Sequence, residues 1–150
     1  MLMITLAGLS LSGRSAHASE WDLNPEEMIW VGPHLNFIFG HQELEVSLGL
    51  EGSYWFTSQD DLPLAGACLG LEYNFKRAQI LGYAQGQLSF LFGGGSFGAI
   101  YEPERGLGVQ GSLWANFGLG GIFHYRYFSS ELPSDKVAGV YLKLPVWERD

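Results

Sequence analysis

His124 and the serines that follow it are the residues of this chain whose types suggest nucleophilic chemistry. Ser129 and Ser130 lie five and six positions after His124, and Glu131 comes next. A serine nucleophile needs its histidine base within hydrogen-bond reach. Along an extended strand, the six positions between His124 and Ser130 amount to about 20 Å. The spacing gives no catalytic pair, so we expect this protein not to be an enzyme.

Acidic residues are the second group that could do chemistry, because carboxylates bind metal ions and act as paired catalysts. Glu45, Glu51 and Glu72 are balanced by basic residues predicted on the same strand faces, and buried charges require such partners. Ion pairs are therefore the better interpretation, and we expect no metal and no cofactor. The predicted interior polar network consists of Glu45, Glu51, Glu72, Lys76, His124, Arg126 and Lys143.

A two-residue alternation must position these side chains. In residues 44–56, the even positions are apolar apart from Gly52, whereas the odd positions are glutamate, serine and glycine up to Trp55. This period is that of a β-strand and not that of a helix. It recurs in eight segments: 28–40, 44–56, 64–76, 79–92, 97–102, 107–117, a seventh around 123–127, and 137–147. Glycines at 93–95 and at 118–121 predict tight turns between segments.

The N-terminal 18 residues predict a secretory signal peptide. An apolar run over residues 2–11 precedes Ala16-His17-Ala18, a small-x-small sequence that signal peptidase accepts. The alternative is that this segment forms a strand of its own. Residues 19–27 are polar and acidic and predict an N-terminal arm, followed by one domain over residues 28–147. The single cysteine, Cys68, allows no intramolecular disulfide, and the net charge of −8 argues against nucleic acid as a partner.

The composition of the polar face indicates which side of the sheet points inward. A soluble barrel would present lysine, glutamate and aspartate to water, whereas this face is mostly glycine, serine, glutamine and asparagine. Small residues with few charges suit the interior of a narrow barrel. The apolar face carries paired aromatic residues near the segment ends, as in the girdles of membrane barrels. The predicted girdle is Phe37, Phe39, Tyr54, Phe56, Tyr73, Phe75, Phe90, Phe92, Tyr125 and Tyr127.

With these features the chain resembles the small outer-membrane β-barrels of Gram-negative bacteria. Such barrels usually end in an assembly signal of the form polar-x-Gly-x-x-apolar-x-aromatic. Gly139, Leu142 and Leu144 match its glycine and its later apolar positions, with Val137 in place of the polar residue and Leu144 in place of the aromatic one. The resemblance implies an all-β, antiparallel, up-and-down barrel of eight strands, assembled by the barrel-assembly machinery.

The same resemblance implies a structural or binding role in the outer membrane and not a wide-channel porin. Its partners would be outer-membrane lipid and lipopolysaccharide, and we expect a monomer. Lipid A deacylases of this type carry a His-x-Ser pair, which neither His34 nor His124 forms. A lipid A-modifying enzyme is therefore the least favoured alternative. The main alternative from another class is a secreted, soluble, lipocalin-like barrel that binds a small apolar ligand.

Overall fold

The computed structural model describes residues 27–39, 43–56, 64–90, 92–115, 118–129 and 134–149. The signal peptide predicted over residues 1–18 lies outside these ranges, as does the predicted arm except for Glu27, which begins the first strand. In the described ranges, no helix is long and apolar enough to span a membrane. The strands are β1 (Glu27–Phe39), β2 (Leu44–Phe56), β3 (Leu64–Asn74), β4 (Gln79–Phe90), β5 (Gly93–Glu102), β6 (Gly106–Ala115), β7 (Leu119–Phe128), β8 (Asp135–Leu142) and β9 (Leu144–Arg149).

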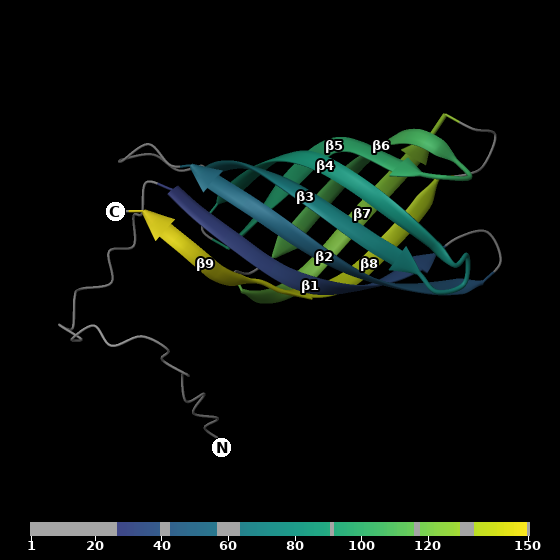
Figure 1. Ribbon diagram of the computed structural model, residues 1–150, viewed down its shortest axis with the longest axis horizontal. Helices are drawn as coiled ribbons and strands as arrows, with labels where there is room; N and C mark the ends of the chain where they lie inside the picture. Colours follow the sequence, from purple (N-terminus) through teal and green to yellow (C-terminus); the bar gives the residue numbers. More distant parts are fainter. Residues whose placement is uncertain are drawn as a thin grey trace, which may run out of the picture.

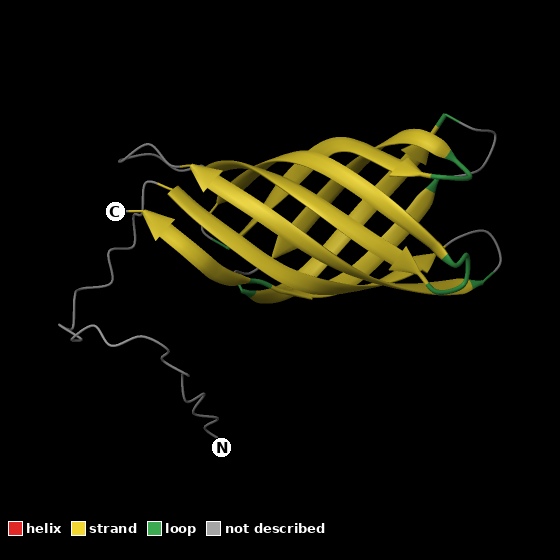
Figure 2. Ribbon diagram, in the orientation of Figure 1, coloured by secondary structure: helices red, strands yellow, loops and turns green. Residues whose placement is uncertain are grey.

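These strands form one closed antiparallel sheet. From β1 to β8, each strand pairs with the next along the chain, and β1 pairs with β2 on one side and with both β8 and β9 on the other. β8 and β9 flank Lys143 and together make the eighth strand of the wall, so the predicted eight-stranded barrel is confirmed. Figures 1 and 2 show the strands of the near wall tilted across those of the far wall. Closure pairs β1 to β8 on both sides, whereas among the described residues β9 pairs with β1 alone.

The two ends of the barrel differ in what they carry. β1 begins and β9 finishes at the same end, on the left of Figure 1, and we call it the terminal end. The opposite end, here called the far end, holds the connections that follow β1, β3, β5 and β7. The connections are short at both ends, as expected for an up-and-down barrel.

The predicted faces of the strands are those of the structure. On β2, Ser47, Glu51 and Ser53 are buried inside the barrel, whereas Leu48 and Leu50 are about half exposed on the outer wall. The same alternation holds on β3 and β4, where Leu69 reaches 68% exposure. The barrel therefore has a polar lumen and an apolar exterior.

The glycines at 93–95 are strand residues, which corrects the predicted turn. They pair with β4 and with β6, so β5 runs from Gly93 to Glu102 and not only over residues 97–102. At Gly94 a β-carbon would collide with the Trp114 ring and with the backbone of Leu88. The sequence does not distinguish this need for space from the need of a tight turn for a positive φ angle.

Several further segment ends differ from the prediction. Gly118 has a φ of +78° and does turn the chain, but residues 119–121 already belong to β7. β3 ends at Asn74 and β4 ends at Phe90, two residues earlier than predicted in each case. The segment predicted over 137–147 is interrupted at Lys143, and its pairing with β1 shifts register only further on, between Pro145 and Trp147. Gly32 leaves the space for this junction, because a β-carbon there would overlap the Leu142 carbonyl.

Candidate functional site

The centre of the lumen is organised around the Glu72 carboxylate on β3. Arg126, on β7 across the lumen, donates to both of its oxygens, at 3.1 Å and 2.6 Å. Asn36 of β1 donates at 2.9 Å, and the Ser47 hydroxyl of β2 also donates to Glu72. A bidentate arginine–carboxylate pair is among the strongest polar contacts available to side chains. Strands from opposite walls are thus tied together through one buried carboxylate.

Arg126 is itself held on both sides. Its Nε donates to Gln110 Oε1 of β6 at 2.6 Å, while its exposure is only 1%. The imidazole of His34 lies against the same carboxylate, with Nε2 3.4 Å from Glu72 Oε2. Because removing one member of a buried pair leaves an uncompensated charge, each of these residues depends on the others.

A second group of polar contacts lies nearer the terminal end, around Glu51. Lys143, at the β8–β9 junction, donates to the Glu51 carboxylate and to Ser53. The Tyr83 hydroxyl of β4 donates to Glu51 Oε2 at 2.6 Å. Gly70 of β3 makes room for the Tyr83 ring, since a β-carbon at that position would collide with it. Lys143, between β8 and β9, thus directs its ammonium group at Glu51.

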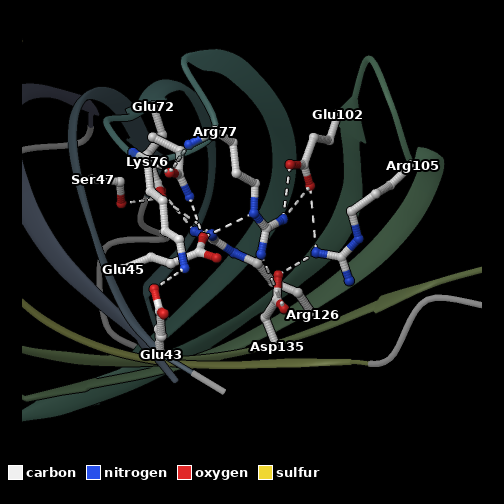
Figure 3. Close-up of polar contacts among 11 residues, drawn as sticks. Glu43, Glu45, Ser47, Glu72, Lys76, Arg77, Glu102, Arg105, Arg126 and Asp135 are labelled. Atoms are coloured by element: carbon white, nitrogen blue, oxygen red, sulfur yellow. Dashed lines mark hydrogen bonds and ion pairs between the residues drawn. The ribbon is translucent and has the colours of Figure 1, made fainter. Parts of the chain in front are cut away.

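The rim of the far end carries a third cluster, shown in Figure 3. Arg77, in the turn after β3, lies 2.8 Å from Glu45 and 2.9 Å from Glu102, with Asp135 at 3.7 Å. Arg105 pairs with Glu102 and Asp135, and its guanidinium stacks over the Phe128 ring at 3.8 Å. Partial burial alone would lower the pKa of Arg77, but the carboxylates of Glu102, Asp135 and Glu45 raise it above its ordinary value. Two arginines and three carboxylates thus close this end of the lumen.

Lys76 lies outside the lumen, which corrects its predicted place in the interior network. It is in the turn over residues 75–78, its side chain is 46% exposed, and it donates to Glu43 at 2.6 Å. This hydrogen bond and the charge of Lys76 lower the pKa of the fully exposed Glu43 carboxyl below its usual value. The strand ends before Lys76, so the alternation that assigned it inward no longer applies.

His124 contacts a serine and not a carboxylate. Its Nδ1 is 2.7 Å from the Ser112 hydroxyl, because Ser112 and His124 face each other in the β6–β7 register. Gln85 also donates to the Ser112 hydroxyl, at 3.4 Å. Both members are buried in the lumen, and among the described residues no ion pair joins His124 to an acid. The two residues have the composition of a nucleophile–base pair but lie inside a packed polar layer.

Tryptophans line the lumen at the terminal end. Trp55 and Trp114 meet edge to face with ring centroids 5.9 Å apart, and together with Trp30 and Tyr141 they contribute to the lining of a cavity of ≈ 30 Å³. Gln87 also borders this cavity, and within the described part of the chain its Oε1 has no hydrogen-bond partner. The cavity is large enough for water but not for a bulky ligand.

All ten residues of the predicted aromatic girdle point outward and are at least 36% exposed. They fall into two groups according to the register of the sheet. Those near the far end are Phe37, Phe39, Tyr73, Phe75, Tyr125 and Tyr127, and those near the terminal end are Tyr54, Phe56, Phe90 and Phe92. Aliphatic residues such as Leu48, Leu50 and Leu71 lie between the groups. Tyr101 and Trp147 join the two groups but were not predicted.

The sequence analysis missed most of the rim cluster. Glu102 and Arg105 flank a turn, and Asp135 precedes the segment predicted over residues 137–147, so strand alternation assigned none of them to the lumen. Of the predicted network, Glu45, Glu51, Glu72, His124, Arg126 and Lys143 do lie inside the barrel. In the described ranges, no group of three or more histidine, cysteine, aspartate or glutamate side chains is placed to hold a metal ion.

The chain and its barrel fold can be compared with known proteins and solved structures. No protein-family model matches the chain, and no curated protein matches it. A solved structure described as "De novo design of transmembrane beta-barrels" is similar, with a TM-score of 0.51 over 81% of this chain and 100% of that chain. The protein is a small transmembrane-type β-barrel. At 11% identity the likeness concerns the fold of the barrel alone.

Proposed function

We propose that this barrel resides in an outer membrane, with a structural or binding role in the cell envelope. The observation that carries the proposal is the outer wall, where leucine, phenylalanine and tyrosine side chains are exposed on every strand pair. Twenty-nine large apolar residues are exposed in this way in the described ranges. A monomeric soluble protein does not display an apolar surface of that extent to water. Such a wall is suited to lipid.

The packing of the lumen argues against a wide channel. Arg126, Phe128 and Ile100 are each at most 1% exposed, and the layers around Glu72 and Glu51 cross the lumen from wall to wall. The interior of an eight-stranded barrel is just wide enough for side chains to fill. Solutes would have to break ion pairs to pass, so we propose a support or binding function and not transport.

The soluble, lipocalin-like alternative loses its support, since it requires an apolar lumen and the lumen is polar. We also propose that the barrel is not an enzyme. Ser112 and His124 are the best candidates for catalysis, but both are buried and Gln85 occupies the serine hydroxyl as well. No substrate could reach that hydroxyl without opening the packed layer around it.

The apolar outer wall also supports the proposed partners of the barrel. These are outer-membrane lipid and lipopolysaccharide, which would surround a monomeric barrel. Assembly would require the barrel-assembly machinery, because the final strand must close against the first. Leu35 and Asn36 of β1 pair with Val140 and Gly139 of β8, within the segment that resembles the assembly signal. Closure at this seam satisfies the backbone groups of both strands, as a bilayer demands.

Three measurements test the proposal. Membrane fractionation of the source cells should recover the protein with the outer membrane. The purified protein should need detergent and should migrate differently on a gel before and after boiling. Liposomes containing it should exclude small sugars. A monodisperse protein in plain buffer would overturn the membrane assignment, and rapid sugar entry would overturn the closed lumen.

A further inference from the structure

The outer wall is not uniform, because a large hollow crosses it over β4, β5, β6 and β7. The hollow has a volume of ≈ 1270 Å³ and is lined mainly by apolar residues and glycines, with Gln87, Ser96 and Ser112 also in the lining. Its walls are formed by Leu88, Phe90, Phe97, Leu113, Phe123 and Tyr125.

The register of the strands creates this hollow. Gly95 lies between Leu88 and Leu113 on the neighbouring strands, and Phe97 lies between two glycines, Gly86 and Gly111. From one strand to the next, large apolar side chains therefore alternate with glycines. The backbone at the glycines is left uncovered between the large side chains. On β2 and β3, in contrast, Leu48 faces Tyr73 and Leu50 faces Leu71, so large side chains are direct neighbours across these two strands.

One end of the hollow is polar. The Tyr125 hydroxyl donates to the Ser134 hydroxyl at 2.9 Å, and Lys136 of β8 is the direct cross-strand neighbour of Tyr125. Lys136 is exposed, its neighbour on β1 is Phe39, and it takes part in none of the ion pairs of the described residues. This exposed ammonium group between two aromatic side chains is placed to pair with an anionic headgroup.

From this juxtaposition we propose that the wall binds one anionic glycerophospholipid. An acyl chain occupies the hollow over β4–β7, and the headgroup phosphate contacts the Lys136 ammonium and the hydroxyls of Tyr125 and Ser134. The inference rests on the proposed function, because it requires the wall to face a bilayer. A single lysine matches the single charge of a phosphodiester, which favours a phospholipid over a lipid with several phosphates.

A second copy of the chain fits the same surface less well. An isologous contact would need a carboxylate on the outer wall to meet Lys136. Glu27 is the acidic residue that the alternation of β1 assigns to the outer face, and it lies at the terminal end, beside Phe56 and Arg149. Lys136 lies toward the far end, so the two charges do not meet in a side-by-side pair.

The chain offers a matched control for the hollow. A smaller hollow of ≈ 550 Å³ has Gly52 of β2 in its lining. A β-carbon on Gly52 would meet only Val31, at 4.0 Å, and one on Gly111 would meet only Phe97, at 3.8 Å. Leucine at either position is therefore compatible with the backbone and fills one hollow at a time.

The test is native mass spectrometry of the detergent-solubilised barrel titrated with dioleoylphosphatidylglycerol or dioleoylphosphatidylcholine. We expect one phosphatidylglycerol bound about fivefold more tightly than phosphatidylcholine, the effect of one lysine near a membrane surface. Lys136→Gln should abolish that preference. Gly111→Leu should weaken binding of both lipids, whereas Gly52→Leu should leave binding unchanged. The heat-dependent gel shift of each variant verifies that it folds.

Three results would overturn the inference. They are a phosphatidylglycerol preference that survives Lys136→Gln, equal losses in Gly111→Leu and Gly52→Leu, and a dimer mass that Gly111→Leu removes. Tighter retention of purified lipid A than of phosphatidylglycerol would also refute the assignment to a phospholipid. Flotation with pure phosphatidylcholine vesicles tests the proposed function separately. A barrel that floats with these vesicles but shows no lipid preference contradicts only the inference. A barrel that does not float contradicts the proposed function.

Discussion

The lumen and the outer wall of this barrel are built on opposite rules. Inside, nearly every charge has a defined partner on another strand, as Glu72 has Arg126 and Glu51 has Lys143. Outside, apolar side chains follow one another with few specific contacts between them. The comparison teaches that a change in the lumen acts through a named partner, whereas a change on the wall acts through its depth in the membrane.

The largest effect is expected from Arg126→Met in the lumen. The substitution leaves Glu72 buried without its counter-charge, which should reduce the free energy of unfolding by about 3–5 kcal/mol. Urea unfolding in lipid vesicles, followed by tryptophan fluorescence, measures this loss. The double variant Arg126→Met/Glu72→Gln removes both charges and should recover part of the stability. If the double variant is less stable than the single one, partner-specific pairing is not what holds the lumen.

On the wall, Leu48→Arg should have the next largest effect. Leu48 lies in the aliphatic zone between the two aromatic groups, where arginine should cost about 2–4 kcal/mol. Phe39→Arg near the far end is the matched control and should cost only about 0–1 kcal/mol. The same unfolding assay applies. Equal losses at the two positions would contradict a dependence on membrane depth.

Replacing a glycine by alanine should change the stability less, and the change should differ between the lumen and the outer wall. Gly70→Ala forces the Tyr83 ring away from its place beside Glu51 and should cost about 1–3 kcal/mol. Gly52→Ala, on the wall of the neighbouring strand, meets no close atom and should be neutral or stabilise by about 0.5–1 kcal/mol. Thermal unfolding of the pair measures the difference, and a reversed order would reject the assignment of inner and outer faces.

The smallest effect concerns the exposed pair at the far end. Lys76→Ala should raise the pKa of Glu43 toward its ordinary value, because the ammonium group lowers it. The lowered pKa stabilises the fold above the ordinary carboxyl pKa, and that contribution disappears as the pH falls through the lowered value. Carboxyl ¹³C chemical shifts in micelles report the titration. An unchanged Glu43 pKa in the variant would show that the pair does not form in solution.

Much of the fold could be read from the sequence, since alternation is a local property of each strand. The boundaries of β2 and the inward placement of Glu51, Glu72 and Arg126 follow directly from it. The wrong predictions concern residues near the ends of strands. Lys76 was assigned to the lumen because the alternation was carried past the end of β3, and Gly93 was assigned to a turn because glycine serves turns and crowded strands alike.

The sequence by itself determined the strands and their two faces, and hence a barrel with a polar lumen and an apolar exterior. Only the tertiary structure decided which charges meet. Glu72 and Arg126 are 54 positions apart, Lys143 reaches Glu51 from 92 positions away, and Arg77 joins acids from three different hairpins. The physical reason is that alternation fixes the side of the sheet on which a residue lies, whereas contact across a lumen depends on the register and tilt of all eight wall strands together.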